Sequence, residues 1–220
     1  NTLRGNLNWM RSRELGLQSD LFGDDIEKLL PIVDERGSDS ACLDNTLELL
    51  TTAGRDLHHA MLMLIPQAWG EKYPMGPDLR GFFEYHAGLM EPWDGPAAAV
   101  FADGRTVGAL LDRNGLRPAR YTITKDGFMV LASEAGVLDI PPEQVLEKGA
   151  LRPGQMILVD LAAGRVLKDV EIKMRLARRQ PYRRWVEENK IAIHGFFGAV
   201  TPTPPEVEGL LQRQKYFGYT

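Results

Sequence analysis

The sequence is poor in the features that mark several large classes of protein. It contains one cysteine, Cys42, in 220 residues, so it can form no internal disulfide and no multi-cysteine metal cluster, and we expect a reducing compartment. It has no apolar run of the roughly 20 residues that a membrane-spanning helix needs, because the best candidate, HAMLMLIPQAW, is interrupted at Pro66. It has no cationic excess either, with 26 basic and 30 acidic residues. We therefore expect neither nucleic acid nor membrane as a partner.

The chain also lacks an initiator methionine and the charged-then-apolar pattern of a signal peptide. It opens with NTLRGNLNWM and closes on RQKYFGYT. We therefore expect an internal piece of a longer polypeptide, located in the cytoplasm. What is present is ordinary for a globular protein, since 44% of the residues are hydrophobic and 25% are charged. A chain of this length can bury about 70% of the surface that it exposes when unfolded.

Helical periodicity dominates the first 90 residues. It predicts helices over residues 24–33, from just after GSDS to Gly54, and from Asp56 to about Ile65, where Pro66 stops the last one. The second of these helices can be capped by a side chain of the GSDS stretch, because a side-chain oxygen there can accept a free N–H group of the first turn. The candidates for this cap are Ser38, Asp39 and Ser40.

A period of two replaces the helical period from about residue 97. Three strand pairs are predicted, with turns near residues 103–104, 126–127 and 163–164. Consecutive hairpins predict one antiparallel meander, and helices followed by strands predict the α+β class. After about residue 174 the pattern becomes basic and helix-prone. We therefore expect one domain over residues 1–175 and the start of another over residues 176–220.

Cys42 is the first candidate for chemistry. It lies near the start of a predicted helix, a position that lowers a thiol pKa, and His58 or His59 could act as its base in a thiol hydrolase. Nothing in the spacing brings these residues together, however, since they lie in successive predicted helices. A free cysteine is more often a small buried side chain, which is the interpretation that the residues favour.

Asp39 and the histidines are the other candidates. The Asp39 carboxylate either caps the helix that follows or binds the ammonium group of a ligand, and local sequence favours the cap. His58 and His59 are adjacent, so they point to different faces of a helix and form no metal pair. We expect no metal site and a structural role for these two histidines as for His86 and His194.

The stretch DRNGLRPARY combines a tight turn with arginines. Such a turn could hold an anion. Arg117 precedes Pro118, however, and the residue before a proline favours extended backbone that leads into a strand. The residues therefore favour a structural role for this turn.

Several longer blocks resemble a known family. NTLRGNLNWM, SDSACLDNTLELL, HAMLMLIPQAW, FFEYHAGLMEPWDGPAAAVFADG, LDRNGLRPARY, ASEAGVLD and GQMILVD resemble, in order and spacing, the glutamate synthase large (alpha) subunit family, in the second half of its N-terminal glutamine amidotransferase domain. The resemblance covers essentially the whole chain. RNGLRP and the later ASE also resemble the wider group of class II amidotransferases.

The resemblance implies an Ntn-hydrolase fold, an αββα four-layer sandwich with antiparallel sheets. The family's nucleophile is a cysteine at the mature N-terminus, and its oxyanion Asn-Gly belongs to an NGEIN stretch of which Asn1 resembles the last residue. The chain is thus expected to hold no catalytic residue and to be inactive alone. One role carries over to this sequence: Asp39 is expected to bind the α-ammonium group of L-glutamine, with Ser38 as a weaker candidate that shapes the pocket.

The resemblance also implies a larger reaction. Glutamine hydrolysis would release ammonia, which the whole enzyme would use to convert 2-oxoglutarate to glutamate. No cofactor is expected in this chain; FMN and an iron–sulfur cluster are implied for the full-length enzyme. Expected partners are the remaining domains of the same polypeptide and a small NADPH-oxidising subunit or ferredoxin, with the plastid stroma as the location in a plant or alga. Two alternatives stay open: the Cys42 thiol hydrolase and a non-catalytic structural or docking domain.

Overall fold

The computed structural model describes residues 4–5, 7–34, 36–191 and 209–216. The chain divides into two compact units, residues 1–186 and 187–220, and each is described by itself. In the second unit the described elements are the end of one helix and α7 (Leu210–Tyr216). All that follows concerns the first unit. The expected boundary after residue 175, between two different domains of a longer polypeptide, stays a prediction.

Two of the three helices predicted near the N-terminus are confirmed. The helix after GSDS is α2, which Ser38 caps by accepting the Ala41 N–H at 3.2 Å, and it ends before Gly54, whose φ is +86°. The helix before Pro66 is α3. The described helices of this part of the chain are α1 (Leu7–Glu14), α2 (Asp39–Thr52), α3 (Leu57–Leu64), α4 (Pro77–Leu89), α5 (Asp169–Ala177) and α6 (Tyr182–Asn189). No helix in the described residues is long and apolar enough to cross a membrane.

The α-helix predicted over residues 24–33 is wrong in type and in length. The segment forms a 3-10 helix, η1 (Gly23–Leu29), and Leu30 is already extended, with φ −81° and ψ 139°. Pro31 gives the reason, because a proline lacks the N–H group that continues a helix and disfavours helical backbone in the residue before it. The apolar spacing was helical, but the proline ended the helix early.

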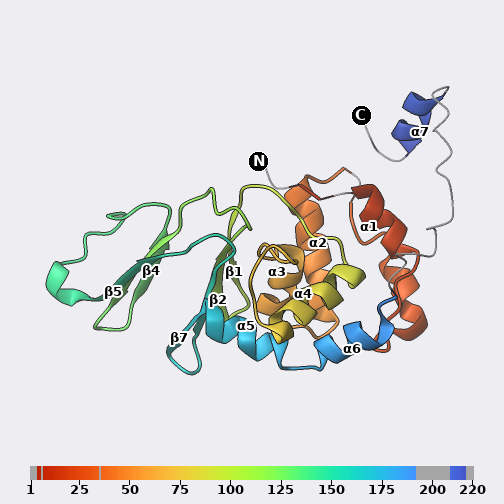
Figure 1. Cartoon of the computed structure of the whole chain (residues 1–220). Coiled ribbons are helices and arrows are strands. Elements are labelled where there is room, and N and C mark those ends of the chain that lie inside the picture. The colour runs from red at the N-terminus through yellow and green to blue at the C-terminus, as the bar shows by residue number, and fades with distance from the viewer. Residues whose placement is uncertain (1–3, 6, 35, 192–208, 217–220) are drawn as a thin grey trace. The chain divides into compact units, whose positions relative to one another are not determined.

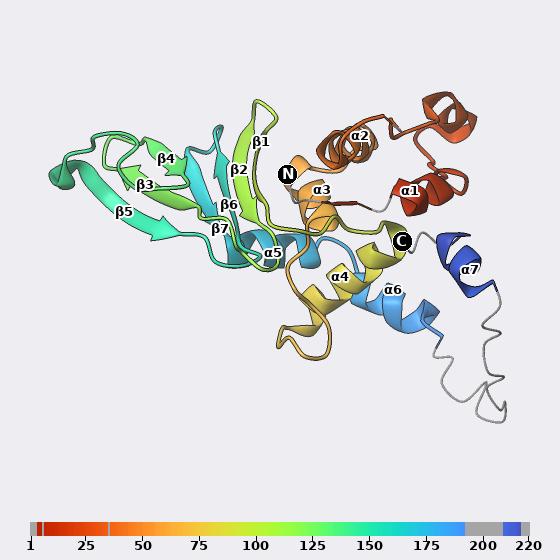
Figure 2. The same cartoon turned by 90° about the horizontal axis from the view of Figure 1, so that it is seen from above.

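The three predicted strand pairs are confirmed, whereas the single meander is wrong. The structure contains two antiparallel sheets, because β2 pairs with β6 although β3, β4 and β5 lie between them in the sequence. β5 was not predicted. The larger sheet has the order β1-β2-β6-β7 and the smaller the order β4-β3-β5, and both appear in Figures 1 and 2. The strands are β1 (Ala98–Ala102), β2 (Thr106–Leu111), β3 (Arg120–Thr124), β4 (Met129–Ala132), β5 (Val145–Ala150), β6 (Met156–Asp160) and β7 (Arg165–Lys168), with a short 3-10 helix, η2 (Pro142–Gln144), before β5. The predicted α+β class is confirmed.

Helices cover one face of the larger sheet. α5 packs against β6 and β7 and also against α4, and Figure 2 shows α5 alongside these strands. Phe101 and Leu158 of this sheet belong to the same buried cluster as the helical residues. Gly108 of β2 lies under the ring of Phe101, where a Cβ atom would collide with the ring. The sheet and the helices therefore share one core.

α3 is buried on every side. All six of its residues from His59 to Leu64 are buried, and five of them are apolar. His59 is the exception and is satisfied inside the core, since its Nε2 lies 2.9 Å from Nε2 of His86 on α4. Nδ1 of His86 lies 2.7 Å from the carbonyl oxygen of Phe82. A carbonyl can only accept, so His86 Nδ1 donates to Phe82 and His86 Nε2 accepts the proton of His59 Nε2.

Burial keeps both histidines neutral. It lowers the pKa of His59 to about 3, with further lowering by His86 and Arg55, and lowers the pKa of His86 to about 4. An unfolded histidine titrates near 6.5. Because the folded pKa lies below the unfolded one, the unfolded state binds protons first as the pH falls, and stability is lost between about pH 6.5 and pH 4.

We predict that the free energy of unfolding falls by as much as about 2 kcal/mol per histidine between pH 6.5 and pH 5. Protonation of His86 at Nε2 would also place two donors face to face, because His59 Nε2 already carries a proton. The measurement is urea unfolding at a series of pH values. His59→Gln, which can still donate to His86 but does not titrate, should flatten the slope; a slope equal to that of the wild type would contradict the prediction.

Candidate functional site

Asp39 is the first residue of α2 and does not cap it. Ser38 provides the cap, so the expectation that the Asp39 carboxylate caps this helix is wrong. The backbone of Ser38 is extended, which points its hydroxyl at the free N–H groups of the first turn. The Asp39 carboxylate instead accepts the N–H of Gly5 through Oδ1 at 3.1 Å. Its second oxygen, Oδ2, has no hydrogen-bond partner among the described residues.

The backbone carbonyl of Asp39 is held by a tryptophan that sequence reasoning missed. Trp93 Nε1 donates to this oxygen at 2.9 Å, and the side chain of Trp93 is 3% exposed. The two residues are 54 positions apart. The only signal in the sequence was the presence of Trp93 inside one of the blocks that resemble the family.

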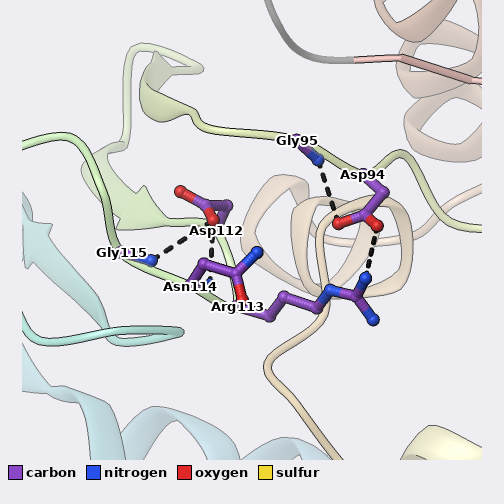
Figure 3. A network of polar contacts seen from close by, with 6 residues as sticks. All are labelled: Asp94, Gly95, Asp112, Arg113, Asn114 and Gly115. Atoms are coloured by element: carbon purple, nitrogen blue, oxygen red, sulfur yellow. Dashed lines mark hydrogen bonds and ion pairs between the residues drawn. The ribbon is translucent and has the colours of Figure 1, made fainter.

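The turn in DRNGLRPARY is organised by Asp112, which is 1% exposed. Its Oδ2 accepts the N–H groups of Asn114 at 2.9 Å and Gly115 at 3.2 Å, as Figure 3 shows. Gly115 has φ +59°, and a Cβ atom there would lie 2.7 Å from Pro153. Arg117 is exposed in the loop before β3. The structural role expected for this turn agrees with these contacts.

Arg113 in the same turn reaches back to the segment before β1. Its Nη2 lies 2.5 Å from Oδ2 of Asp94, and Oδ1 of Asp94 accepts the N–H of Gly95 at 2.9 Å. Both charged side chains are about half exposed. An exposed pair of this kind contributes about 0–1 kcal/mol to stability, so it orients Asp94 more than it holds the fold.

Cys42 is a buried thiol. It is 6% exposed, and its Sγ lies 3.5 Å from the carbonyl oxygen of Asp34. Burial raises the pKa of the thiol, and the carboxylates of Asp39 and Asp34 raise it further. Since the thiolate is the nucleophilic form, this environment is the opposite of an activating one. Within the described residues Cys42 has no hydrogen bond to His58 or His59, so the geometry favours helix packing over the thiol hydrolase.

The histidines do not form a metal site in the described part of the chain. His59 pairs with His86 inside the core, and His58 is half-buried, with its pKa lowered by burial. Across the described ranges no three His, Cys, Asp or Glu side chains are placed to bind a metal ion. His194 lies outside the described residues.

Lys173 is another buried titratable group. It is 3% exposed, with Nζ 2.7 Å from Asp169, 2.5 Å from Oε1 of Gln67 and 2.7 Å from the carbonyl oxygen of Gly154. Burial lowers its pKa, against the effect of Asp169. All three donor directions are used, so Lys173 ties α5 to two loops and is not available as a base.

Comparison with known protein families identifies the family of this chain. Residues 1–185 match the model of the class II glutamine amidotransferases. Because this match covers most of the chain, the chain belongs to the class II glutamine amidotransferase family.

Within this family, the chain is similar to several glutamate synthases. The chain is 49% identical to the glutamate synthase [NADPH] large chain of Bacillus subtilis and 47% identical to ferredoxin-dependent glutamate synthase 2 of Synechocystis sp.; each alignment covers 100% of this chain and 14% of the relative. It is also 49% identical to the glutamate synthase [NADH] of Saccharomyces cerevisiae, over 86% of this chain and 9% of that protein. The chain thus spans a small part of the length of these relatives.

We predict that Cys42 resists alkylation in the folded protein. Its raised pKa and its burial should make the reaction with iodoacetamide at pH 7.5 at least about tenfold slower than that of a free thiol. Mass spectrometry of timed samples measures the rate, and urea should restore it. Rapid stoichiometric labelling of the folded protein with loss of activity would support the thiol hydrolase instead.

Proposed function

We propose that the chain forms the second half of the glutaminase domain of a glutamate synthase and that Asp39 binds the α-ammonium group of L-glutamine. The observation that carries the proposal is that, within the described residues, only one of the two carboxylate oxygens of Asp39 has a hydrogen-bond partner. Ser38 already caps α2, Gly5 takes Oδ1, and Oδ2 has no partner in the described part of the chain. A half-buried carboxylate with one free oxygen suits a cationic group on a substrate.

The strength of such a contact is sufficient for recognition. A hydrogen bond between charged groups contributes about 1.5–3 kcal/mol, which corresponds to roughly ten- to hundredfold in affinity. Asp39 also lies in the first turn of α2, where the helix dipole stabilises a negative charge. Ser38 would act beside it by fixing the start of the helix.

The bond-breaking step is proposed to use a cysteine outside these 220 residues. Its thiolate would attack the amide carbon of glutamine, ammonia would leave, and water would cleave the glutamyl thioester to glutamate. The buried thiol of Cys42 supports an outside nucleophile. The two antiparallel sheets and the covering helices are compatible with an αββα Ntn-hydrolase sandwich completed by residues outside the chain. The isolated chain is accordingly proposed to be inactive.

The wider reaction is proposed to take place in other domains of the same polypeptide. There, ammonia would convert 2-oxoglutarate to glutamate with FMN and an iron–sulfur cluster. These residues do not fit a cluster, because Cys42 is the only cysteine and a cluster takes four ligands of that kind. The relatives are named for NADPH, NADH and ferredoxin, so this part of the sequence does not select the electron donor. The cytoplasm, or a plastid stroma, is the proposed location.

We predict that Asp39→Asn in the complete polypeptide raises the KM for glutamine about ten- to hundredfold. Asparagine keeps an oxygen for the Gly5 N–H and removes only the charge. Steady-state assays with glutamine and with ammonium chloride as the nitrogen source measure the effect. The ammonia-dependent synthesis should survive, since it needs no glutaminase site.

The matched control is Asp44→Asn, an exposed aspartate on the same helix. It should change neither assay by more than about twofold, because it removes a solvated charge only. Equal loss of glutamine- and ammonia-dependent synthesis in Asp39→Asn would contradict the site assignment. An unchanged KM for glutamine would favour the structural or docking domain.

A further inference from the structure

Trp93 joins three segments at the start of α2. Its main-chain N–H donates to the carbonyl oxygen of Leu64, the last residue of α3, at 2.7 Å. Its indole Nε1–H donates to the carbonyl oxygen of Asp39 at 2.9 Å. The ring is 3% exposed. Trp93 therefore ties the first residue of α2 to the end of the most deeply buried helix.

The next residue, Asp94, holds the segment that contacts the Asp39 carboxylate. The N–H of Arg4 donates to the carbonyl oxygen of Asp94 at 2.7 Å, and the N–H of Asp94 donates to that of Arg4 at 2.9 Å. Gly5 follows Arg4 and donates to Asp39 Oδ1. The contacts close a ring in which residues 93–94 fix Asp39 from both sides: through its carbonyl group directly, and through its carboxylate by way of residues 4–5.

This circle of contacts requires a glycine at position 5. A Cβ atom there would lie 2.5 Å from Nε1 and Cε2 of the Trp93 indole, which is closer than atoms can pack. The indole thus lies directly against the Gly5 backbone. Any side chain at position 5 would push the two apart and move the N–H group that orients the Asp39 carboxylate.

The ion pair between Asp94 and Arg113 supports the ring from outside. It joins Asp94 to the turn of residues 112–115 that follows β2 (Figure 3). The pair is half-exposed and such pairs are weak, whereas the Trp93 contact is buried. Loss of the Trp93 N–H should therefore disturb Asp39 more than loss of the Arg113 side chain.

We propose that Trp93 is a positioning residue for glutamine recognition, which acts through Asp39. This inference rests on the proposed function of Asp39. The indole N–H and the indole ring of Trp93 set where the Asp39 carboxylate points. One carboxylate oxygen then stays hydrogen-bonded to Gly5, and the other faces the substrate ammonium group. Glutamine affinity then depends on a residue that is not itself the ligand of that group.

The test is Trp93→Phe in the complete polypeptide. Phenylalanine keeps an aromatic ring in the space but has no N–H donor. The KM for glutamine should rise about fivefold, as expected for one lost neutral hydrogen bond, while kcat and the ammonia-dependent synthesis stay within about twofold. Trp69→Phe is the matched control. Trp69 is a partly buried tryptophan that packs against the same core, and its replacement should leave the KM for glutamine unchanged.

A double variant separates positioning from a merely structural role. If Trp93 acts through Asp39, Trp93→Phe should raise the KM little further in the Asp39→Asn background. The same increase in both backgrounds, or an equal fall in glutamine- and ammonia-dependent synthesis, would overturn the inference. Gly5→Ala is a second route to the same displacement that leaves Trp93 in place, and it should reproduce the KM effect. An unchanged KM in Gly5→Ala would also count against the inference.

The two proposals fail in different ways. If Asp39→Asn leaves the KM for glutamine unchanged, the function proposed for Asp39 fails. If Asp39→Asn raises this KM but neither Trp93→Phe nor Gly5→Ala does, only the positioning role of Trp93 fails.

Discussion

The burial of residues 59–64 of α3 is the constraint on which the rest of this structure depends. A short helix with apolar residues all round must be covered on every side, and each large side chain so buried contributes about 1.5–3 kcal/mol. The buried polar residue of this helix, His59, then needs a partner within the core, which His86 supplies. The end of the helix needs a donor for its last carbonyl groups, and the N–H of Trp93 supplies one at Leu64. Core packing and the candidate site therefore share one anchor.

Trp93 explains how an irregular segment can hold Asp39, the proposed binding residue, in place. Residues 4–5 belong to no named helix or strand, and within the described residues they are fixed by an isolated bridge to Asp94 and by the contacts of Gly5 with Asp39 and Trp93. Trp93 connects the buried core to the first residue of α2, and Asp94 connects it to residues 4–5. Because Ser38 takes over the capping role, the Asp39 carboxylate is left for other contacts. Because Ser38 caps the helix and Asp39 does not, the start of α2 is suitable for a ligand.

Sequence reasoning succeeded for most features with local determinants, although it missed the local effect of Pro31 on the helix predicted over residues 24–33. The hairpin turns followed from Asp-Gly and Ala-Gly pairs whose glycines have positive φ, and the start of α2 followed from its capping residues. It failed for contacts between segments far apart in the sequence, such as the pairing of β2 with β6. The contacts of Asp39 span 34 and 54 positions, so no local pattern could reveal them. The role of Asp39 came from family resemblance, whereas that of Trp93 emerged only from the folded geometry.

The proposed contact between Asp39 and the α-ammonium group is tested most directly by a substrate that lacks this group. The glutaminase kcat/KM of the complete polypeptide would be compared for glutamine and for 5-amino-5-oxopentanoate, its analogue without the amino group. The wild type should prefer glutamine, and Asp39→Asn should reduce that preference about ten- to hundredfold. A preference that is the same in the wild type and in Asp39→Asn would contradict the assignment.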